Sequence, residues 1–252
     1  MNVTRTGVIG DLHIPFHNPR IVTLVLDVFE DIGVDRIVLN GDVLDFYGVN
    51  SHGPKHPDIR ENLEDELDAG REFFNNLRKR FPKIPIVFNA GNHEFRLDRF
   101  IIKNCKPFWN ILTVEKQMNL ELLDIEYFPY NNRYRLEKSN MYIQHSPASY
   151  SSPQANFTTN PDSSSIFNCS HRAGMAARTG SKEVYYSYFN GWLSTWDLTP
   201  THKEAFRFIK NHNKWQNCFS IVTCIDETKA INNQYIIDDY KCVVDGNLYE
   251  AS

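Results

Sequence analysis

The tetrad Gly91-Asn92-His93-Glu94 holds the residues of this sequence whose types and spacing best suit chemistry. Asn92 offers a neutral oxygen, His93 an imidazole that can bind a metal or move a proton, and Glu94 a carboxylate. Taken alone, the tetrad is equally well explained as the entrance to a helix with polar capping residues. Two further clusters of the same kind favour the chemical interpretation.

These clusters are Asp11-Leu12-His13 and Gly41-Asp42-Val43-Leu44-Asp45. Each of the three clusters follows a short apolar run that is typical of a buried strand. In a parallel sheet the carboxyl ends of the strands lie along one edge, so the side chains of the clusters should meet there. The expected group comprises Asp11, His13, Asp42 and Asn92. Carboxylate, imidazole and amide oxygen ligands suit divalent ions such as Mn, Fe(II) or Zn.

The elements that must position these clusters follow from the spacing of the apolar residues. Strands are expected at 6–10, 36–40 and 84–89, with helices at 18–32, 59–80 and 95–102. This alternation demands a parallel sheet covered by helices. Further short strands are expected at 124–128, 133–136, 141–144, 184–189, 218–225 and 233–237, with a polar loop at 146–165. Because there is no internal repeat or linker, one domain over 1–252 is the economical interpretation.

The composition is that of an ordinary globular protein. Charged residues make up 23% of the chain, and the net charge of −4 gives no general basic excess that would indicate a nucleic-acid binder. Five cysteines without a CxxC pair argue against a disulfide framework, so we expect a reducing, intracellular compartment such as the cytoplasm. The N-terminal residues lack the apolar stretch of a signal peptide, and no apolar run of about 18 residues would span a membrane.

The order of the motifs points to a known family. Asp-x-His, Gly-Asp-x-x-Asp and Gly-Asn-His-Glu are followed by His145, after the strand expected at 141–144, and by His171, after a further short strand that includes residues 164–167. In this order and spacing the chain resembles the calcineurin-like metallophosphoesterases over essentially its whole length. Gly91-Asn-His-Glu-Phe-Arg96 and the segments 190–192 and 213–219 are similar to small phage-encoded members, which would act in the host cytoplasm. The resemblance implies a four-layer α/β/β/α sandwich, with two mixed sheets flanked by helices.

The resemblance also implies two divalent metal ions, with manganese as the first choice and zinc, iron or nickel as alternatives. Asp11 and His13 would hold the first ion, Asp42 would bridge both, Asn92 and His145 would hold the second, and His171 would complete a shell. Two ions roughly 3.5–4 Å apart can hold a bridging hydroxide that attacks phosphorus directly, so no protein nucleophile is needed.

The resemblance assigns catalytic and supporting roles to the remaining motif residues. His93 would be the general acid that protonates the leaving group, a contribution of about 10²–10⁴ in rate. Asp42 would take part in catalysis as the bridging ligand. Asp45 would orient a neighbouring metal ligand, and Glu94 would hold its loop rather than do chemistry.

The last motif departs from the family pattern. The family usually has Gly-His-x-His, whereas this chain has Asn168-Cys169-Ser170-His171, so Cys169 stands where a ligand of the second metal is expected. Three alternatives are open. Cys169 binds the second metal and, as a soft thiolate, favours zinc or iron; or the second site is weak or empty; or His171 serves the second metal. The structural alternative for Cys169 is a small buried residue beside a strand.

The substrate would be a phosphate ester, and a diester such as a nucleotide or nucleic acid is slightly favoured over a protein or small-molecule phosphomonoester. Arg96 would bind a phosphate oxygen or pair with an acidic neighbour, and Arg172 and His52 are further candidates for substrate contacts. The competing class is a non-catalytic metal-binding scaffold of the same fold, for which Cys169 is the only sequence feature. The sequence leaves the oligomeric state open.

Overall fold

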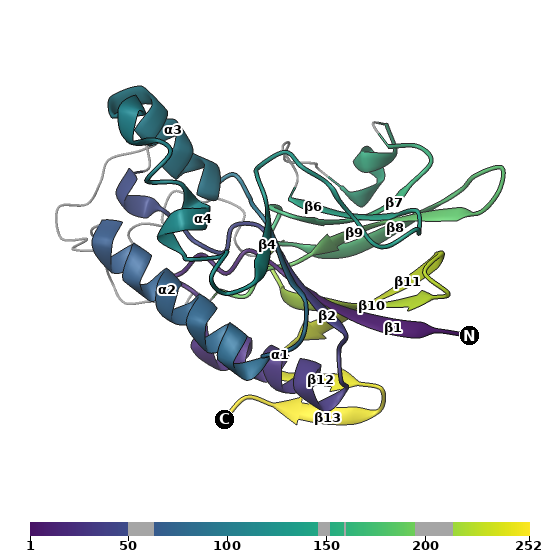
Figure 1. Ribbon diagram of the computed structural model, residues 1–252. Coiled ribbons are helices and arrows are strands. Elements are labelled where there is room, and N and C mark those ends of the chain that lie inside the picture. The colour runs from purple at the N-terminus through teal and green to yellow at the C-terminus, as the bar shows by residue number, and fades with distance from the viewer. Residues whose placement is uncertain (50–62, 146–151, 159, 195–213) are drawn as a thin grey trace.

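A six-stranded mixed sheet contains the three strands that end in the polar clusters (Figure 1). The structure, a computed structural model, describes residues 1–49, 63–145, 152–158, 160–194 and 214–252. The strand order is β11-β10-β1-β2-β3-β4. The parallel strands are β1 (Val3–Ile9), β2 (Arg36–Asn40), β3 (Ile86–Asn89) and β4 (Ile125–Phe128), and the antiparallel ones are β10 (Asn217–Ile225) and β11 (Lys229–Ile237). The predicted parallel arrangement of the first three strands is confirmed.

A second sheet has five strands in the order β5-β6-β7-β9-β8. They are β5 (Tyr134–Arg135), β6 (Met141–His145), β7 (Ser164–Asn168), β8 (Ala173–Thr179) and β9 (Val184–Asn190), of which β6, β7 and β9 are parallel. The edge strand β8 was not predicted from the sequence. Its residues, Ala-Gly-Met-Ala-Ala-Arg-Thr, have little preference for strands, and its pairing with β9 along its whole length overrides that preference.

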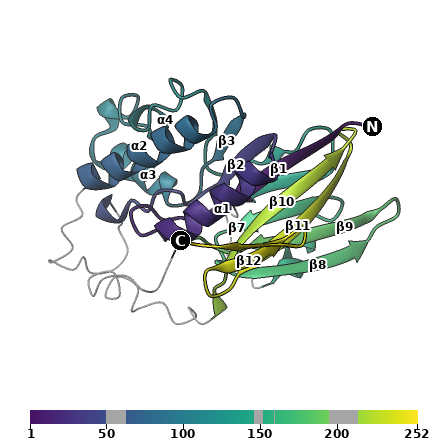
Figure 2. The same ribbon diagram turned by 90° about the horizontal axis from the view of Figure 1, so that it is seen from below.

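In the described residues, four α-helices pack beside the first sheet (Figure 1 and Figure 2). They are α1 (Pro19–Asp31), α2 (Leu63–Arg80), α3 (Glu94–Asn104) and α4 (Val114–Gln117). Helix α1 begins where the sequence predicts, because the Asn18 side chain accepts hydrogen bonds from the backbone N–H groups of Arg20 and Ile21. Short 3-10 helices lie at Tyr47–Val49, Lys106–Phe108 and Pro153–Thr158, and the last of these contacts β8 and β9.

The two sheets pack face to face through a small apolar core. Val8 and Val38 of the first sheet meet Ile143, Ile166 and Tyr188 of the second. Two mixed sheets packed on each other, with α-helices outside the first, confirm the expected fold class. The hairpin of β12 (Lys241–Val244) and β13 (Asn247–Glu250) turns at Asp245-Gly246, a pair of residue types that is typical of hairpin turns. No helix in the described part of the chain is long and apolar enough to cross a membrane.

Candidate metal centre

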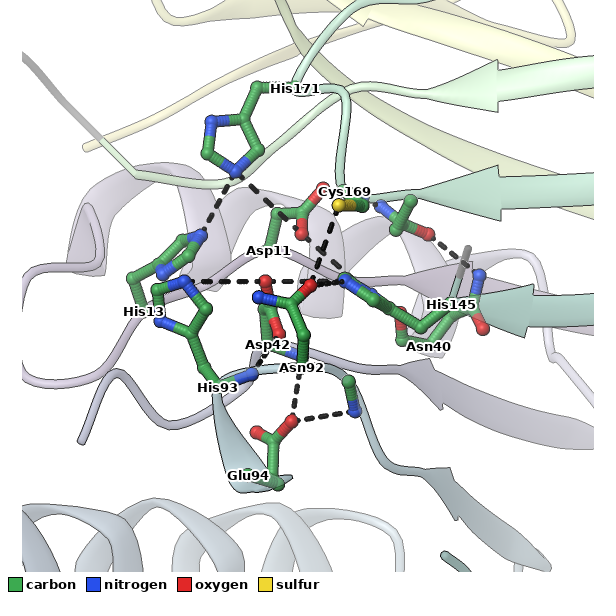
Figure 3. A network of polar contacts seen from close by, with 12 residues as sticks. Asp11, His13, Asn40, Asp42, Asn92, His93, Glu94, His145, Cys169 and His171 are labelled. Carbon is green, nitrogen blue, oxygen red and sulfur yellow. Dashed lines mark hydrogen bonds and ion pairs between the residues drawn. The ribbon is translucent and has the colours of Figure 1, made fainter. Parts of the chain in front are cut away.

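Strands of both sheets end at one edge of the sandwich, and the predicted polar clusters lie there (Figure 3). The first sheet supplies Asp11 and His13 after β1, Asp42 and Asp45 after β2, and Asn92, His93 and Glu94 at the end of β3 and the start of α3. The second sheet supplies His145 at the end of β6, and Cys169 and His171 after β7. The structure therefore brings together all of these sequence-predicted residues.

The turns after β1 and β2 hold their side chains with a strained backbone. Asp11, His13 and Asp42 have φ angles of 52°, 55° and 48°, in the left-handed region that disfavours residues other than glycine. The turns also bind each other, because the backbone N–H of Asp11 donates to the Gly41 carbonyl and that of His13 to the Asp42 carbonyl. Gly91 permits the third turn to approach, since a Cβ atom there would lie 2.2 Å from Asp42 Oδ1.

One group of potential metal ligands consists of Asp11, His13 and His171. The Nε2 atoms of His13 and His171 face each other at 3.1 Å. Asp11 Oδ1 is buried, lies 3.8 Å from His171 Nε2 and has no hydrogen-bond partner in the described structure. Burial raises the pKa of Asp11 to about 7, because a buried carboxylate charge is costly without a nearby cation. The unpartnered oxygen and the two opposed nitrogens fit a divalent cation between them.

Two tryptophans hold His171 in this group. Its imidazole stacks on Trp192 with 5.4 Å between ring centroids, and it meets Trp215 edge-on at 4.0 Å. Burial and the neighbouring His13 hold the pKa of His171 well below its usual value, so the ring is neutral, which is the form that binds metals. This position puts His171 beside the predicted first metal.

A second group of ligands surrounds His145. His145 Nδ1 lies 3.0 Å from the Asn40 carbonyl oxygen, while Nε2 lies 3.0 Å from Asn92 Oδ1 and 3.2 Å from Asp42 Oδ2. All three of these oxygens are hydrogen-bond acceptors. Burial lowers the pKa of His145, but the Asp42 carboxylate outweighs it and raises the pKa well above its usual value. A proton on Nε2 thus holds the place that a cation would take.

The residue common to both groups is Asp11, which lies with Asp42 and His145 as well as with His13 and His171. The family resemblance gives the shared position to Asp42. Asp42 itself lies between the two histidines of the motifs, with Oδ2 at 3.2 Å from His145 Nε2 and 3.6 Å from His93 Nε2. Neighbouring His145 and His93 hold the pKa of Asp42 well below its usual range despite its burial, so the carboxylate is charged.

Cys169 faces the second group. Its Sγ lies 3.4 Å from Asn92 Oδ1, and its backbone N–H donates to Asp11 Oδ2 at 2.8 Å. The side chain is only partly buried and points to the ligand atoms (Figure 3). The position of Cys169 therefore differs from the structural alternative, in which it would be a small buried residue beside a strand.

Asp45 contacts a potential metal ligand, and Glu94 contacts the turns that carry the ligands. Asp45 Oδ2 lies 3.0 Å from His13 Nδ1, which leaves His13 Nε2 directed at the cation position. The Glu94 carboxylate accepts hydrogen bonds from three backbone N–H groups, those of Gly91, Asp42 and Leu44, at 2.7–3.0 Å. Glu94 therefore ties the second and third turns together.

His93 and Arg96 form a pair within the site. His93 Nδ1 lies 3.0 Å from the Asp45 carbonyl oxygen, and Arg96 Nη2 lies 2.6 Å from His93 Nε2. Arg96 Nη1 also donates to the Asp45 carbonyl oxygen at 3.0 Å and lies 3.4 Å from Asp45 Oδ1. Of the two expectations for Arg96, the structure shows the pairing with an acidic neighbour.

Arg172 and His52 are the other two candidates for substrate contacts. Arg172 follows His171 at the entrance to β8 and is half-buried. His52 and the expected start of α2 at residue 59 lie outside the described residues.

Two asparagines that sequence reasoning missed support the ligands. Asn168 Nδ2 donates to Asp11 Oδ2 at 3.3 Å, and Asn168 Oδ1 accepts from Asn40 Nδ2 at 2.9 Å. Each is the last residue of its strand and is fully buried. The sequence signal for both asparagines is a polar residue at the end of an otherwise apolar strand.

Comparison with known proteins identifies the family of the chain. The sequence profile described as calcineurin-like phosphoesterase matches residues 4–241, and no curated protein sequence gives a significant match. The fold is similar to Vps29 from Chaetomium thermophilum (11% identity, 99% of this chain and 100% of that chain covered, TM-score 0.49). It is also similar to a dimetal phosphatase from Danio rerio (11%, 91% and 98%, 0.42) and to the phosphoesterase Yfce from E. coli (15%, 98% and 99%, 0.38). Because the profile spans nearly the whole sequence, this chain belongs to the calcineurin-like phosphoesterase family.

Proposed function

We propose that the chain is a metal-dependent phosphoesterase that holds two divalent cations at the edge where the two sheets meet. The observation that carries this proposal is the pair of ligand groups joined by Asp11, with opposed Nε2 atoms in one group and an unpartnered buried carboxylate oxygen facing them. Such an arrangement is costly without cations and is relieved by them.

The first cation position takes Asp11, His13 and His171. The second takes Asp42, Asn92 and His145 with Cys169, and Asp11 lies with this group as well. We assign manganese to the first position, because its donors are hard or borderline. A Cys169 thiolate is a soft donor and favours zinc or Fe(II) at the second position. When bound, the cations supply Lewis acidity toward the phosphate and lower the pKa of water.

His93 and Arg96 supply the proton and the phosphate contact. His93 Nε2 is the nitrogen that faces the ligand groups, and it is the proton donor to the leaving oxygen. Donation requires Arg96 to leave this nitrogen, and a substrate phosphate oxygen is the acceptor that the planar guanidinium fits. Asp42 Oδ1 accepts the backbone N–H of His93 at 2.8 Å and so positions the donor.

The charge of the site supports a diester substrate, a nucleotide or a nucleic acid. A diester carries one negative charge, whereas a monoester dianion needs more cationic donors. Of the two arginines expected to contact substrate, Arg96 already pairs with Asp45 and Arg172 follows His171 at the entrance to β8. The net charge of −4 adds no further attraction for a dianion.

The test combines metal content with turnover. Protein purified without chelator is analysed for bound metal and assayed with bis-p-nitrophenyl phosphate and p-nitrophenyl phosphate, beside His145→Ala. We expect two ions per chain, faster turnover of the diester, and loss of turnover in His145→Ala. At most one ion and no turnover with added Mn, Zn, Ni or Fe would identify a non-catalytic scaffold instead.

A further inference from the structure

The last residues of α3 and the turns that follow the helix expose a cluster of large apolar side chains. The cluster lies within residues 100–111, which we name the apolar tip, and each member is between 39% and 60% exposed. Its members are Phe100, Ile102, Phe108, Trp109 and Ile111. Ile102 of the helix and Trp109 of the turns border the same hollow, so the two parts of the tip adjoin. Single exposed apolar residues are normal on a protein surface, whereas a cluster indicates contact with a partner or a membrane.

The apolar tip is a folded part of the chain. Helix α3 packs on the core through Leu97 and Ile101, which are buried. In the turns, the backbone N–H of Trp109 donates to the Lys106 carbonyl oxygen at 3.1 Å, and the side chain of Trp109 hydrogen-bonds the Asp98 carboxylate. These contacts hold the Trp109 ring at the surface. Fraying of the helix end therefore does not explain the exposed side chains.

The apolar tip lies away from the metal centre. Helix α3 begins at Glu94, beside the proposed ligands, and Figure 1 shows it extending away from both sheets. Its 11 residues rise about 16 Å along the helix axis. A contact made by the tip is therefore separate from the metal ligands.

Basic side chains accompany the apolar ones. Residues 99–114 contain Arg99, Lys103 and Lys106 and no acidic residue, although the net charge of the whole chain is −4. All three are exposed, and none of them forms an ion pair with another described residue. The tip thus complements a partner that combines apolar groups with negative charge.

The charges and the side-chain types select one occupant. A second copy that docked through the same tip would bring like charges together, which is unfavourable. Nucleic acid is anionic, but it offers flat bases for stacking, and the aliphatic Ile102 and Ile111 do not stack. A bilayer with anionic lipids offers alkyl chains beneath negative headgroups, and tryptophan is enriched at that boundary. The combination of exposed Trp, Phe and Ile with Lys and Arg is typical of a segment that lies in a membrane interface.

We propose that the apolar tip binds the surface of a bilayer that contains anionic lipids. Phe108, Trp109 and Ile111 insert between the headgroups, and Lys103 and Lys106 lie against the headgroup charges. The contact is peripheral, because no helix among the described residues could cross a membrane. It does not depend on the phosphoesterase activity, so either proposal can fail without the other.

Flotation of the metal-loaded chain with vesicles tests the electrostatic part. The vesicles are pure phosphatidylcholine, or equal parts of phosphatidylcholine and phosphatidylglycerol, and only the anionic ones should carry the chain. Lys103→Gln/Lys106→Gln should lower the partition coefficient about 30-fold, because each lysine near an anionic surface contributes roughly fivefold. Lys79→Gln/Lys83→Gln removes the same charge from exposed positions elsewhere and should bind as the wild type does.

Substitutions of the apolar side chains test the insertion. Phe108→Ser and Ile111→Ser should each weaken binding to anionic vesicles roughly fivefold or more. Leu248→Ser is the matched control, because Leu248 is 66% exposed on β13 and should not contribute. Anionic vesicles should shift the tryptophan emission of the wild type to shorter wavelength, and Trp109→Phe should lack this shift. Each variant should keep the Tm of the wild type and its turnover of bis-p-nitrophenyl phosphate.

Absence of flotation with anionic vesicles would overturn the proposal. Equal binding by Phe108→Ser and the wild type would do the same, because the lipid would then be held elsewhere, such as by its phosphate at the metal centre. A wild-type chain that is dimeric in sedimentation velocity, with Phe108→Ser monomeric, would assign the tip to a contact between copies and would also contradict the proposal.

Discussion

Replacement of Asp45 by asparagine should weaken metal binding although it changes no proposed ligand. Asp45 Oδ2 accepts a hydrogen bond from His13 Nδ1 at 3.0 Å, and the opposite nitrogen of the same ring faces the cation position. Asparagine keeps the size of the side chain and one carbonyl oxygen but removes the negative charge. His13 would then be a weaker base and its ring would be held less firmly.

The size of the effect follows from how the carboxylate is engaged. Loss of a partner behind a metal-bound histidine typically costs 10–100-fold in metal affinity, or about 1.4–2.7 kcal/mol. Asp45 is buried and its carboxylate also lies 3.3 Å from His93 Nδ1 and 3.4 Å from Arg96 Nη1. Three cationic or hydrogen-bonding neighbours lose their counter-charge together, so we expect the upper half of that range.

Competition with a fluorescent chelator measures the affinity of the wild-type chain, Asp45→Asn and Asp27→Asn for Mn and Zn. Asp27 pairs with Arg80 on the surface, so its replacement removes the same charge far from the proposed ligands. Only Asp45→Asn should bind metal more weakly. Affinities within twofold of the wild type would refute the role of Asp45 behind His13, and an equal loss in both variants would assign the effect to net charge alone.

Four further predictions test the site. Cobalt-loaded wild type should show thiolate-to-cobalt charge-transfer absorption in the near ultraviolet that Cys169→Ser lacks; a spectrum common to both would exclude Cys169 as a ligand. Gly91→Ala should lower turnover by about 10², because its Cβ would lie 2.2 Å from Asp42 Oδ1 and displace that carboxylate; unchanged turnover and metal content would contradict the close packing. Arg96→Lys should raise the inhibition constant of inorganic phosphate roughly tenfold, because the forked guanidinium contact is lost; an unchanged constant would leave Arg96 as a partner of Asp45 only. Removal of metal by a chelator should lower the Tm measured by calorimetry. If free metal was at 100 times its Kd, the loss in the free energy of unfolding is about 2.7 kcal/mol. A Tm that does not respond to chelator would argue against bound metal.

The first half of the fold could be predicted because its signals are local. Apolar runs that end in Asp-x-His, Gly-Asp and Gly-Asn mark the strands and their turns, and the Asn18 cap marks the start of α1. The strand β8 gave no such signal, because alanine and glycine take their conformation there from pairing with β9.

The arrangement of the ligands depended on contacts between distant parts of the chain. His13 and His171 are separated by 158 residues, and their Nε2 atoms meet only because the two sheets pack together. The same packing makes Asp11 common to both groups and closes Arg96 onto His93. Residue types and spacing therefore predicted which side chains gather at the edge, but not which of them pair.

The two ligand groups each draw side chains from both sheets, so cations bound there would also have a mechanical role. A cation between His13 and His171 cross-links segments 158 residues apart, and one between Asn92 and His145 joins segments 53 residues apart. Closing such long loops removes much of the freedom of the unfolded chain, as a disulfide would, and all five cysteines are free thiols. Metal supply would then set how long the folded chain survives, as well as how fast it works.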